Sequence, residues 1–391
     1  MTYSEPVLLK YFNNRKVIEV SCGAAHTTAI VRGCGDGADD YVNTNFSSEY
    51  GHLYGWGDDC FNQIGRHTYC KTEPDDQCVP LRLKPLREAR FLHTSSGFYH
   101  NVALGFFTQK PNQKVVFSWG GGLLGNGTDI YDSTLLPVRT LLEKDVRLVS
   151  AGGLGGTSKE YKQNTGDATD NVPYHKIVTP VSLQFFEGTE VTSVACGIWH
   201  TSVVVLCHGR QKLFVFGNEQ YEGYMRPYCP FYSENFARGT HSIRTVKRII
   251  PDEVFLPDQS PIKKISAGAS FTVALLENGK LFGFGQNPRV CPAAAVPESD
   301  DQEIHINSAD GFANERHVYR LSTGHEESRD PFVDVDCGTN HVVGVTERGH
   351  VFAWGHCFDK ITFDVDKPIK IMDGVSLVKK AACGLDFNVL Y

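Results

Sequence analysis

Short segments in which apolar and polar residues alternate recur along the chain, for example at 17–20, 262–265 and 333–335. A period of two is typical of β-strands, because successive side chains of a strand point to opposite faces. No long window shows the helical period, and glycine and proline fall between the alternating runs as turn residues. The pattern predicts an all-β protein of many short strands.

A short signature repeats within this pattern: apolar residues, a small residue, a glycine and, in most copies, a histidine three positions later. The marker glycines of the seven copies are Gly23, Gly97, Gly152, Gly197, Gly268, Gly338 and Gly384. Five copies are followed by an aromatic residue and a second glycine, with the aromatic residue at Trp56, Trp119, Phe216, Phe284 and Trp354. Each pair of signals predicts a two-stranded hairpin.

The intervals between marker glycines are 74, 55, 45, 71, 70 and 46 residues. They indicate a unit of about 45 to 50 residues with insertions, which suits one four-stranded propeller blade. We therefore predict a seven-bladed β-propeller that forms a single domain over residues 1–391. Insertions are expected at about 34–50, 157–175, 218–260 and 287–331. Each marker glycine is expected at a bend where positive φ or a close backbone approach excludes a Cβ atom.

Two copies carry the signature most clearly, at 22–27 with 53–58 and at 337–341 with 349–355. These segments resemble repeats of the regulator of chromosome condensation family. The resemblance implies a ring closed by pairing of the terminal strands, with residues 6–9 beside the strand that ends at Leu390.

The resemblance also implies an alternative function, guanine nucleotide exchange on a small GTPase. The exchange face of the family's nucleotide exchange factor carries acidic residues just after marker glycines. The matching positions here hold no carboxylate, being Ala24, Phe98, Ile198, Ala269, Thr339 and Leu385. We therefore keep exchange activity as the alternative.

Composition narrows the class of protein. The formal charge is −7, which disfavours a molecule that binds phosphate over its whole surface. The N-terminus shows no basic stretch followed by an apolar core, and no apolar run approaches the roughly 20 residues of a membrane helix. We therefore expect an intracellular protein, cytoplasmic or nuclear, with no membrane contact and with its twelve cysteines reduced.

Charge is also uneven along the chain. Residues 224–250 hold five basic side chains and one acidic one, interleaved with aromatic residues. The basic residues are Arg226, Arg238, Arg244, Lys247 and Arg248. They predict, as a second alternative, an RNA-binding or RNA-modification-associated module, or a surface for an acidic partner. The simpler interpretation is an insertion with solvated charges. Residues 298–330, with nine acidic and three basic side chains, are interpreted as a solvated loop.

The sequence offers few candidate residues for catalysis or for binding a metal or phosphate. The repeated histidines, His26, His100, His200 and His341, are interpreted as structural, each bonded to a backbone carbonyl of its blade. Residues of the types that bind zinc occur in one segment, at Cys60, His67, Cys70 and Cys78, but their spacing lacks the short Cys-x-x-Cys that is usual in structural zinc sites. The glycine run at 152–156 is not followed by Lys-Ser or Lys-Thr, as a phosphate loop requires. We predict no catalytic constellation, metal or cofactor.

The turns after the marker glycines are the predicted partner-binding site. They carry Phe98, Tyr99, Ile198, Trp199, Asn340 and Asp386. Aromatic residues on a rigid support dominate binding energy at many protein interfaces. We therefore predict a non-enzymatic, monomeric scaffold that presents this face to a protein partner. In the alternative interpretation, Tyr99 and Trp199 fill the central channel instead.

Overall fold

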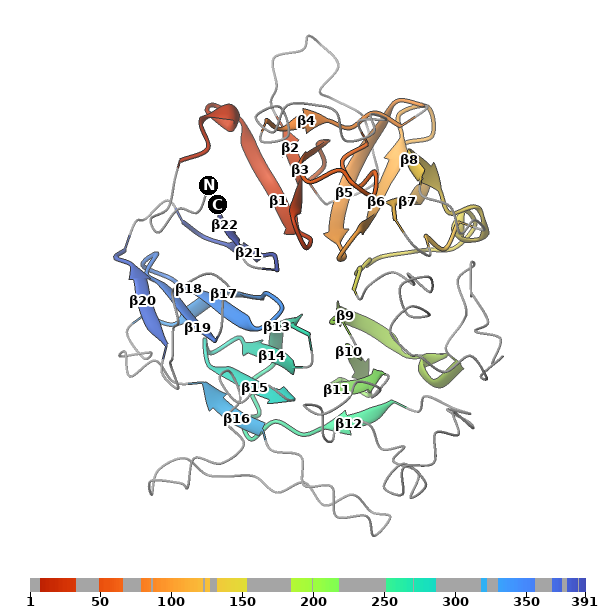
Figure 1. Cartoon of the computed structure of the whole chain (residues 1–391). Coiled ribbons are helices and arrows are strands. Elements are labelled where there is room, and N and C mark those ends of the chain that lie inside the picture. The colour runs from red at the N-terminus through yellow and green to blue at the C-terminus, as the bar shows by residue number, and fades with distance from the viewer. Residues whose placement is uncertain are drawn as a thin grey trace, which may run out of the picture. The chain divides into compact units, whose positions relative to one another are not determined.

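The computed structural model describes most of the strands that the sequence predicts (Figure 1). The described residues are 8–32, 49–65, 79–85, 87–121, 124–126, 132–152, 184–198, 200–217, 251–269, 271–285, 318–321, 330–355, 368–374, 378–385 and 387–391. The chain divides into two compact units, one of residues 1–182, 382–389 and 391, the other of residues 183–381 and 390.

Unit 1 contains two four-stranded antiparallel sheets, each with its strands in sequence order. The first consists of β1 (Lys16–Cys22), β2 (His26–Arg32), β3 (His52–Gly57) and β4 (Leu81–Arg82). The second consists of β5 (Ala89–Ser96), β6 (His100–Phe107), β7 (Lys114–Gly120) and β8 (Asp132–Pro137). A hairpin of β21 (Ala381–Cys383) and β22 (Asn388–Leu390) ends the chain.

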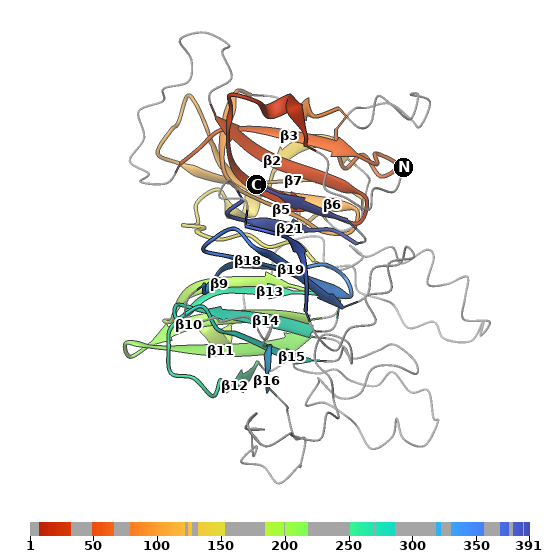
Figure 2. The same cartoon turned by 90° about the vertical axis from the view of Figure 1, so that its left-hand side faces the viewer.

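Unit 2 contains three sheets of the same topology, whose side-by-side strands are clear for β13 to β16 in both views (Figure 1, Figure 2). The first consists of β9 (Glu190–Cys196), β10 (His200–Cys207), β11 (Arg210–Gly217) and β12 (Asp252–Val254). The second consists of β13 (Ile262–Ala267), β14 (Phe271–Leu276), β15 (Leu281–Gly285) and β16 (Val318–Leu321). The third consists of β17 (Phe332–Cys337), β18 (His341–Thr346), β19 (Val351–Gly355) and β20 (Ile369–Met372).

The predicted hairpins are confirmed, and their strands share one register. In the first sheet, Thr27 of β2 lies opposite Trp56 of β3, and His26 lies opposite Gly57. The same relation places Thr201 opposite Phe216 in the β10–β11 pair. The glycine after the aromatic residue has positive φ, +103° at Gly57. Only a residue without Cβ adopts that conformation easily, so Trp-Gly marks the end of the third strand.

Two of the predicted insertions end before their expected boundary. β12 lies within 218–260 and pairs with β11, and β16 lies within 287–331 and pairs with β15. Both strands are short, so their alternation is too brief to register as a separate signal. The insertion predicted at 157–175 lies outside the described residues, as does nearly all of 34–50. The extent of a single domain over 1–391 stays a prediction.

Side chains from the first strand of one sheet accept hydrogen bonds from the backbone of the next sheet in the same unit. Ser21 Oγ of β1 accepts from Ser96 N of β5 at 2.9 Å, and Ser266 Oγ of β13 accepts from Cys337 N of β17 at 3.0 Å. Two positions earlier, Glu19 Oε2 accepts from Thr94 N at 2.8 Å. These side chains satisfy backbone donors that the sheets themselves leave unpaired, and they tie adjacent sheets together within each unit.

The chain termini meet by packing in unit 1. Phe12 follows Leu9 in the 3-10 helix η1 (Lys10–Phe12) and shares a hydrophobic cluster with Tyr54, Ala382 and the partly buried Val389. The predicted pairing of residues 6–9 beside the last strand is not seen at the described positions, where Leu8 and Leu9 lie outside any strand. Burial of Phe12 draws the segment into the helical turn instead.

Candidate functional site

Six of the seven marker glycines stand at the turn between the first two strands of a described sheet or hairpin, and Gly152 lies outside the described strands. The turn of residues 97–100 is closed by a hydrogen bond from Gly97 N to His100 O at 2.8 Å. A Cβ atom on Gly23 would lie 2.5 Å from the backbone oxygen of Gly97 in the next sheet. The close backbone approach, rather than positive φ, therefore accounts for the marker glycine, because Gly23 lies outside the left-handed region.

Neighbouring marker turns are joined to one another. In unit 1, Ala24 N donates to Phe98 O at 3.3 Å, and Leu385 N donates to Gly23 O at 3.3 Å. In unit 2, Ala269 N donates to Thr339 O at 2.9 Å. In each unit these bonds hold the backbone of adjacent turns in one fixed arrangement.

The marker histidines lie beside these turns, with His26, His100 and His341 buried and His200 half-buried. His26 Nε2 bonds the side-chain oxygen of Asn101 in the next sheet at 2.8 Å, so the predicted bond to a carbonyl of its own blade is wrong at this position. Asn101 Nδ2 donates to Gln63 O, which leaves Asn101 Oδ1 as the acceptor and assigns the proton to Nε2 of His26. Burial lowers the pKa of His26 to about 4, so the imidazole is neutral at physiological pH.

A loop at residues 58–65 continues from β3 and lies beside the turn 97–100. Ile64 N donates to Asp59 Oδ1 at 2.8 Å, and Gln63 Nε2 donates to Asp58 Oδ2 at 3.2 Å. The backbone oxygen of Gln63 accepts from both Asn101 Nδ2 and Trp119 Nε1 at 2.8 Å. The loop is therefore fixed to the adjacent β5–β8 sheet.

Three aromatic rings lie together on this loop and turn. The ring centroids of Phe61 and Tyr99 are 4.3 Å apart with a 37° interplanar angle, and those of Phe98 and Tyr99 are 5.8 Å apart, edge to face. All three residues are half-buried. We call Phe61, Phe98 and Tyr99, with the turn and loop that carry them, the turn-side surface.

The structure brings together only part of the predicted site. Phe98 and Tyr99 are in contact in unit 1, whereas Ile198 and Asn340, both half-buried, belong to unit 2. Trp199 and Asp386 lie outside the described residues, and whether Tyr99 and Trp199 fill a channel stays a prediction.

Phe61 and Gln63 are not among the residues predicted from the sequence. Their signal is the sequence Asn62-Gln63-Ile64-Gly65 soon after Trp56-Gly57, a compact turn in which Asn62 and Gly65 have positive φ.

The other candidate sites fall largely outside the described residues. All five basic residues predicted for RNA or an acidic partner lie in 218–250, which is not described. Of the four zinc candidates only Cys60 is described, as an exposed thiol. Within the described ranges no group of three or more metal-ligating side chains occurs, and no helix is long and apolar enough to cross a membrane.

The fold defines a class of protein. The described residues form five four-stranded antiparallel sheets, each a meander that begins beside a marker turn, as blades of a β-propeller do. The family model described as the regulator of chromosome condensation (RCC1) repeat matches residues 50–104, and a second model of this repeat matches 262–289 and 332–356. The chain therefore contains RCC1 repeats at these residues, which confirms the resemblance seen in the sequence.

Two known sequences and one solved structure illustrate what this chain is similar to. The ultraviolet-B receptor UVR8 of Arabidopsis thaliana is 25% identical over 378 residues, which cover 90% of this chain and 67% of the receptor. The human probable E3 ubiquitin-protein ligase HERC6 is 25% identical over 75% of this chain, which spans only 26% of HERC6. The structure of Prp20p from Saccharomyces cerevisiae matches with a TM-score of 0.62 and 18% identity, covering 96% of this chain and 82% of Prp20p. This last likeness shows the fold.

Proposed function

We propose that this chain is a non-enzymatic interaction module that binds a protein partner through its turn-side surface. The observation that carries the proposal is the group of Phe61, Phe98 and Tyr99 on backbone fixed by side-chain hydrogen bonds. Half-buried aromatic rings on a rigid support lose little conformational freedom on binding and supply a large contact area.

The relatives support a protein partner. Prp20p has binding properties toward Gsp1p and histones, and a second structure contains yeast RCC1 (Prp20) bound to Kap60. Seven marker segments further support a complete seven-bladed ring as the scaffold, with the hairpin of β21 and β22 as part of its last blade. The nucleus or cytoplasm remains the expected location.

Nucleotide exchange remains the alternative function. The described positions after the marker glycines carry no carboxylate, and Ala24 and Phe98 use their backbone to bond each other. The RNA alternative depends on residues 224–250, outside the described part, and stays a prediction.

The test is a comparison of two variants by affinity capture with quantitative mass spectrometry. Phe61→Ala with Tyr99→Ala should abolish capture of the main protein partner, with a melting temperature within a few degrees of the original. Phe185→Ala, which removes an aromatic ring that is 49% exposed in unit 2, is the matched control and should retain the partner. Equal capture by both variants would exclude the turn-side surface as the binding site.

A further inference from the structure

A basic surface lies at the end of the β5–β8 sheet opposite the marker turn. Three segments reach this end: residues 79–90 before and at the start of β5, 107–114 between β6 and β7, and 138–147 after β8. Together they hold nine basic and three acidic side chains, within a chain whose formal charge is −7. We call these three segments the basic end of the sheet.

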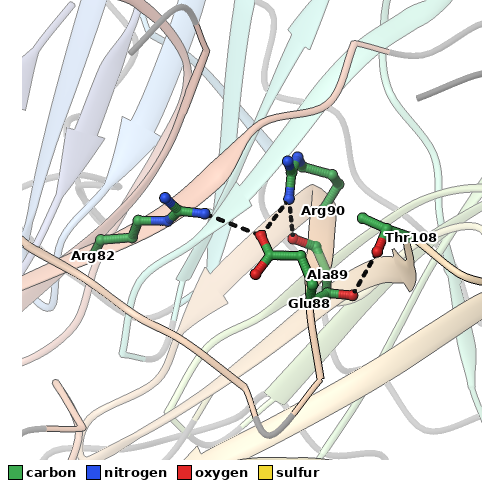
Figure 3. Close-up of polar contacts among 5 residues, drawn as sticks. All are labelled: Arg82, Glu88, Ala89, Arg90 and Thr108. Atoms are coloured by element: carbon green, nitrogen blue, oxygen red, sulfur yellow. Dashed lines mark hydrogen bonds and ion pairs between the residues drawn. The ribbon is translucent and has the colours of Figure 1, made fainter. Parts of the chain in front are cut away.

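Contacts between the segments make the basic end one continuous surface. Thr108 Oγ1 donates to the backbone oxygen of Glu88 at 3.3 Å (Figure 3), and Thr108 N donates to the same oxygen at 3.0 Å. Gln113 Nε2 donates to Leu142 O at 3.0 Å, which joins the second segment to the third. The loops are therefore held in place by hydrogen bonds to one another as well as by the strands.

Two of the three carboxylates are already engaged by cations. Glu88 Oε1 accepts from Arg90 Nη1 at 2.6 Å and from Arg82 Nη2 at 3.0 Å (Figure 3). Burial opposes ionisation of Glu88, but the hydrogen bond and charge of Arg90 outweigh it, so the pKa of Glu88 lies below its ordinary value. Asp145 is bonded in the same way by Arg147 and Lys114.

Five cations of the basic end remain exposed without an ion pair among the described residues. They are Lys84, Arg87, Lys110, Arg139 and Lys144. The guanidinium of Arg87 lies over the ring of Phe107, 6.0 Å from its centroid, which orients this cation on the surface. A cluster of one sign on a rigid support attracts and orients an anionic partner.

Exposed aliphatic side chains distinguish between anionic partners. Val79 and Leu81, in the first segment, are 49% and 40% exposed, and the described residues of the basic end include no exposed aromatic ring. Single-stranded nucleic acid is bound largely by stacking on such rings. A peptide offers both carboxylates and aliphatic side chains.

We propose that the basic end binds an extended acidic segment of a protein partner. Its carboxylates pair with Lys84, Arg87 and Lys110, while its aliphatic side chains pack on Val79 and Leu81. This surface is separate from the turn-side surface, and the proposal does not depend on the function of that surface.

The test is fluorescence anisotropy of the full chain with a synthetic peptide in which glutamate alternates with leucine. The peptide should bind at low ionic strength and be released by salt, and the same peptide with glutamine in place of glutamate should not bind. The triple variant Lys84→Glu, Arg87→Glu and Lys110→Glu should weaken binding by about tenfold or more, since each reversal replaces attraction with repulsion.

The matched control reverses three exposed cations of unit 2, Arg210→Glu, Lys263→Glu and Lys379→Glu, with the same change in total charge. It should bind the peptide as the original chain does, and Tyr99→Ala should also leave binding unchanged. A milder pair, Lys84→Ala with Lys110→Ala, tests the surface if the triple variant melts early. Equal loss in both triple variants, or tighter binding of a duplex or single-stranded oligonucleotide than of the peptide, overturns the proposal.

Discussion

Four marker glycines, Gly23, Gly197, Gly268 and Gly384, have no space for a side chain because backbone beside the next marker turn lies against them. At Gly197 the nearest atom to an added Cβ is the backbone oxygen of Gly268, and at Gly268 the oxygen of Gly338 is 2.7 Å away. Backbone held in two sheets cannot move aside as a flexible side chain does. The glycine thus sets how closely adjacent sheets approach within a unit.

Gly197→Ala should therefore destabilise the protein by about 2–3 kcal/mol, the size of effect expected from overpacking a close contact. Gly55→Ala is the control, because its added Cβ would meet side chains rather than backbone, that of Leu83 at 3.2 Å and that of Ile64 at 3.5 Å. Urea denaturation of both variants measures the difference. Similar midpoints for the two variants would contradict the role assigned to the marker glycine.

Three marker histidines couple stability to pH. Burial lowers the pKa of His26, His100 and His200 from 6.5 to about 4. Between these values the unfolded chain binds a proton that the folded chain does not, so stability is complete above pH 6.5 and falls as pH decreases toward 4. Each histidine should contribute a slope of about 1.4 kcal/mol per pH unit within this window.

His100→Gln should reduce that slope, measured as the free energy of unfolding at several values between about pH 5 and 6.5. Gln109→Asn changes an exposed side chain that does not titrate and should leave the slope unchanged. An unaltered slope in the His100 variant would mean that this imidazole is not the source of the pH dependence.

At the scale of the strands, the side-chain acceptors between sheets follow a regular position. The hydroxyl of the residue two positions before a marker glycine accepts from the backbone N–H of the residue immediately before the next marker glycine. Ser21, Ser95 and Ser266 do so. The side chain four positions before a marker glycine accepts from the backbone N–H three positions before the next marker glycine. Glu19 and Asp334 do so. Thiols add to this pattern, since Cys337 Sγ donates to Ser266 O at 3.4 Å.

Ser266→Ala should destabilise the protein by about 1–3 kcal/mol, because it leaves Cys337 N buried without its acceptor. Ser260 provides the control, since its hydroxyl accepts from Asn278 N at 3.3 Å in an exposed turn. Ser260→Ala should change the free energy of unfolding by less than about 0.5 kcal/mol. Thermal unfolding of the two variants separates a bond between sheets from a bond within a turn.

At the scale of the molecule, most of the C-terminal residues belong to unit 1, which also contains residues 1–182. Residues 382–389 fall in unit 1, and Ala382, Val389 and Tyr391 contribute to the cluster around Phe12. Unit 1 is therefore incomplete without residues 382–389, which follow nearly all of unit 2 in the sequence. This arrangement makes the stability of unit 1 depend on the intact C-terminus.

Removal of residues 381–391 should lower the free energy of unfolding by about 3 kcal/mol, the value expected for exposing one or two large apolar side chains. Limited proteolysis should then cut first within unit 1. Leu8→Ser, at a side chain that is already 74% exposed, should leave both measurements unchanged. Preferential cleavage of unit 2 in the truncated chain would show that the terminal hairpin stabilises the other unit.

Local pattern is sufficient to predict the strands, the hairpins and the turn position of Phe98 and Tyr99, because alternation and glycine spacing report on neighbours along one chain segment. Local pattern does not predict the contacts between sheets. His26 bonds a residue 75 positions away, Ser266 bonds one 71 positions away, and the ring of Phe61 reaches Tyr99 from a different sheet. The basic end likewise joins three segments that are dispersed in sequence. These contacts depend on how the ends of one sheet align with those of the next, and that alignment arises only when the sheets pack.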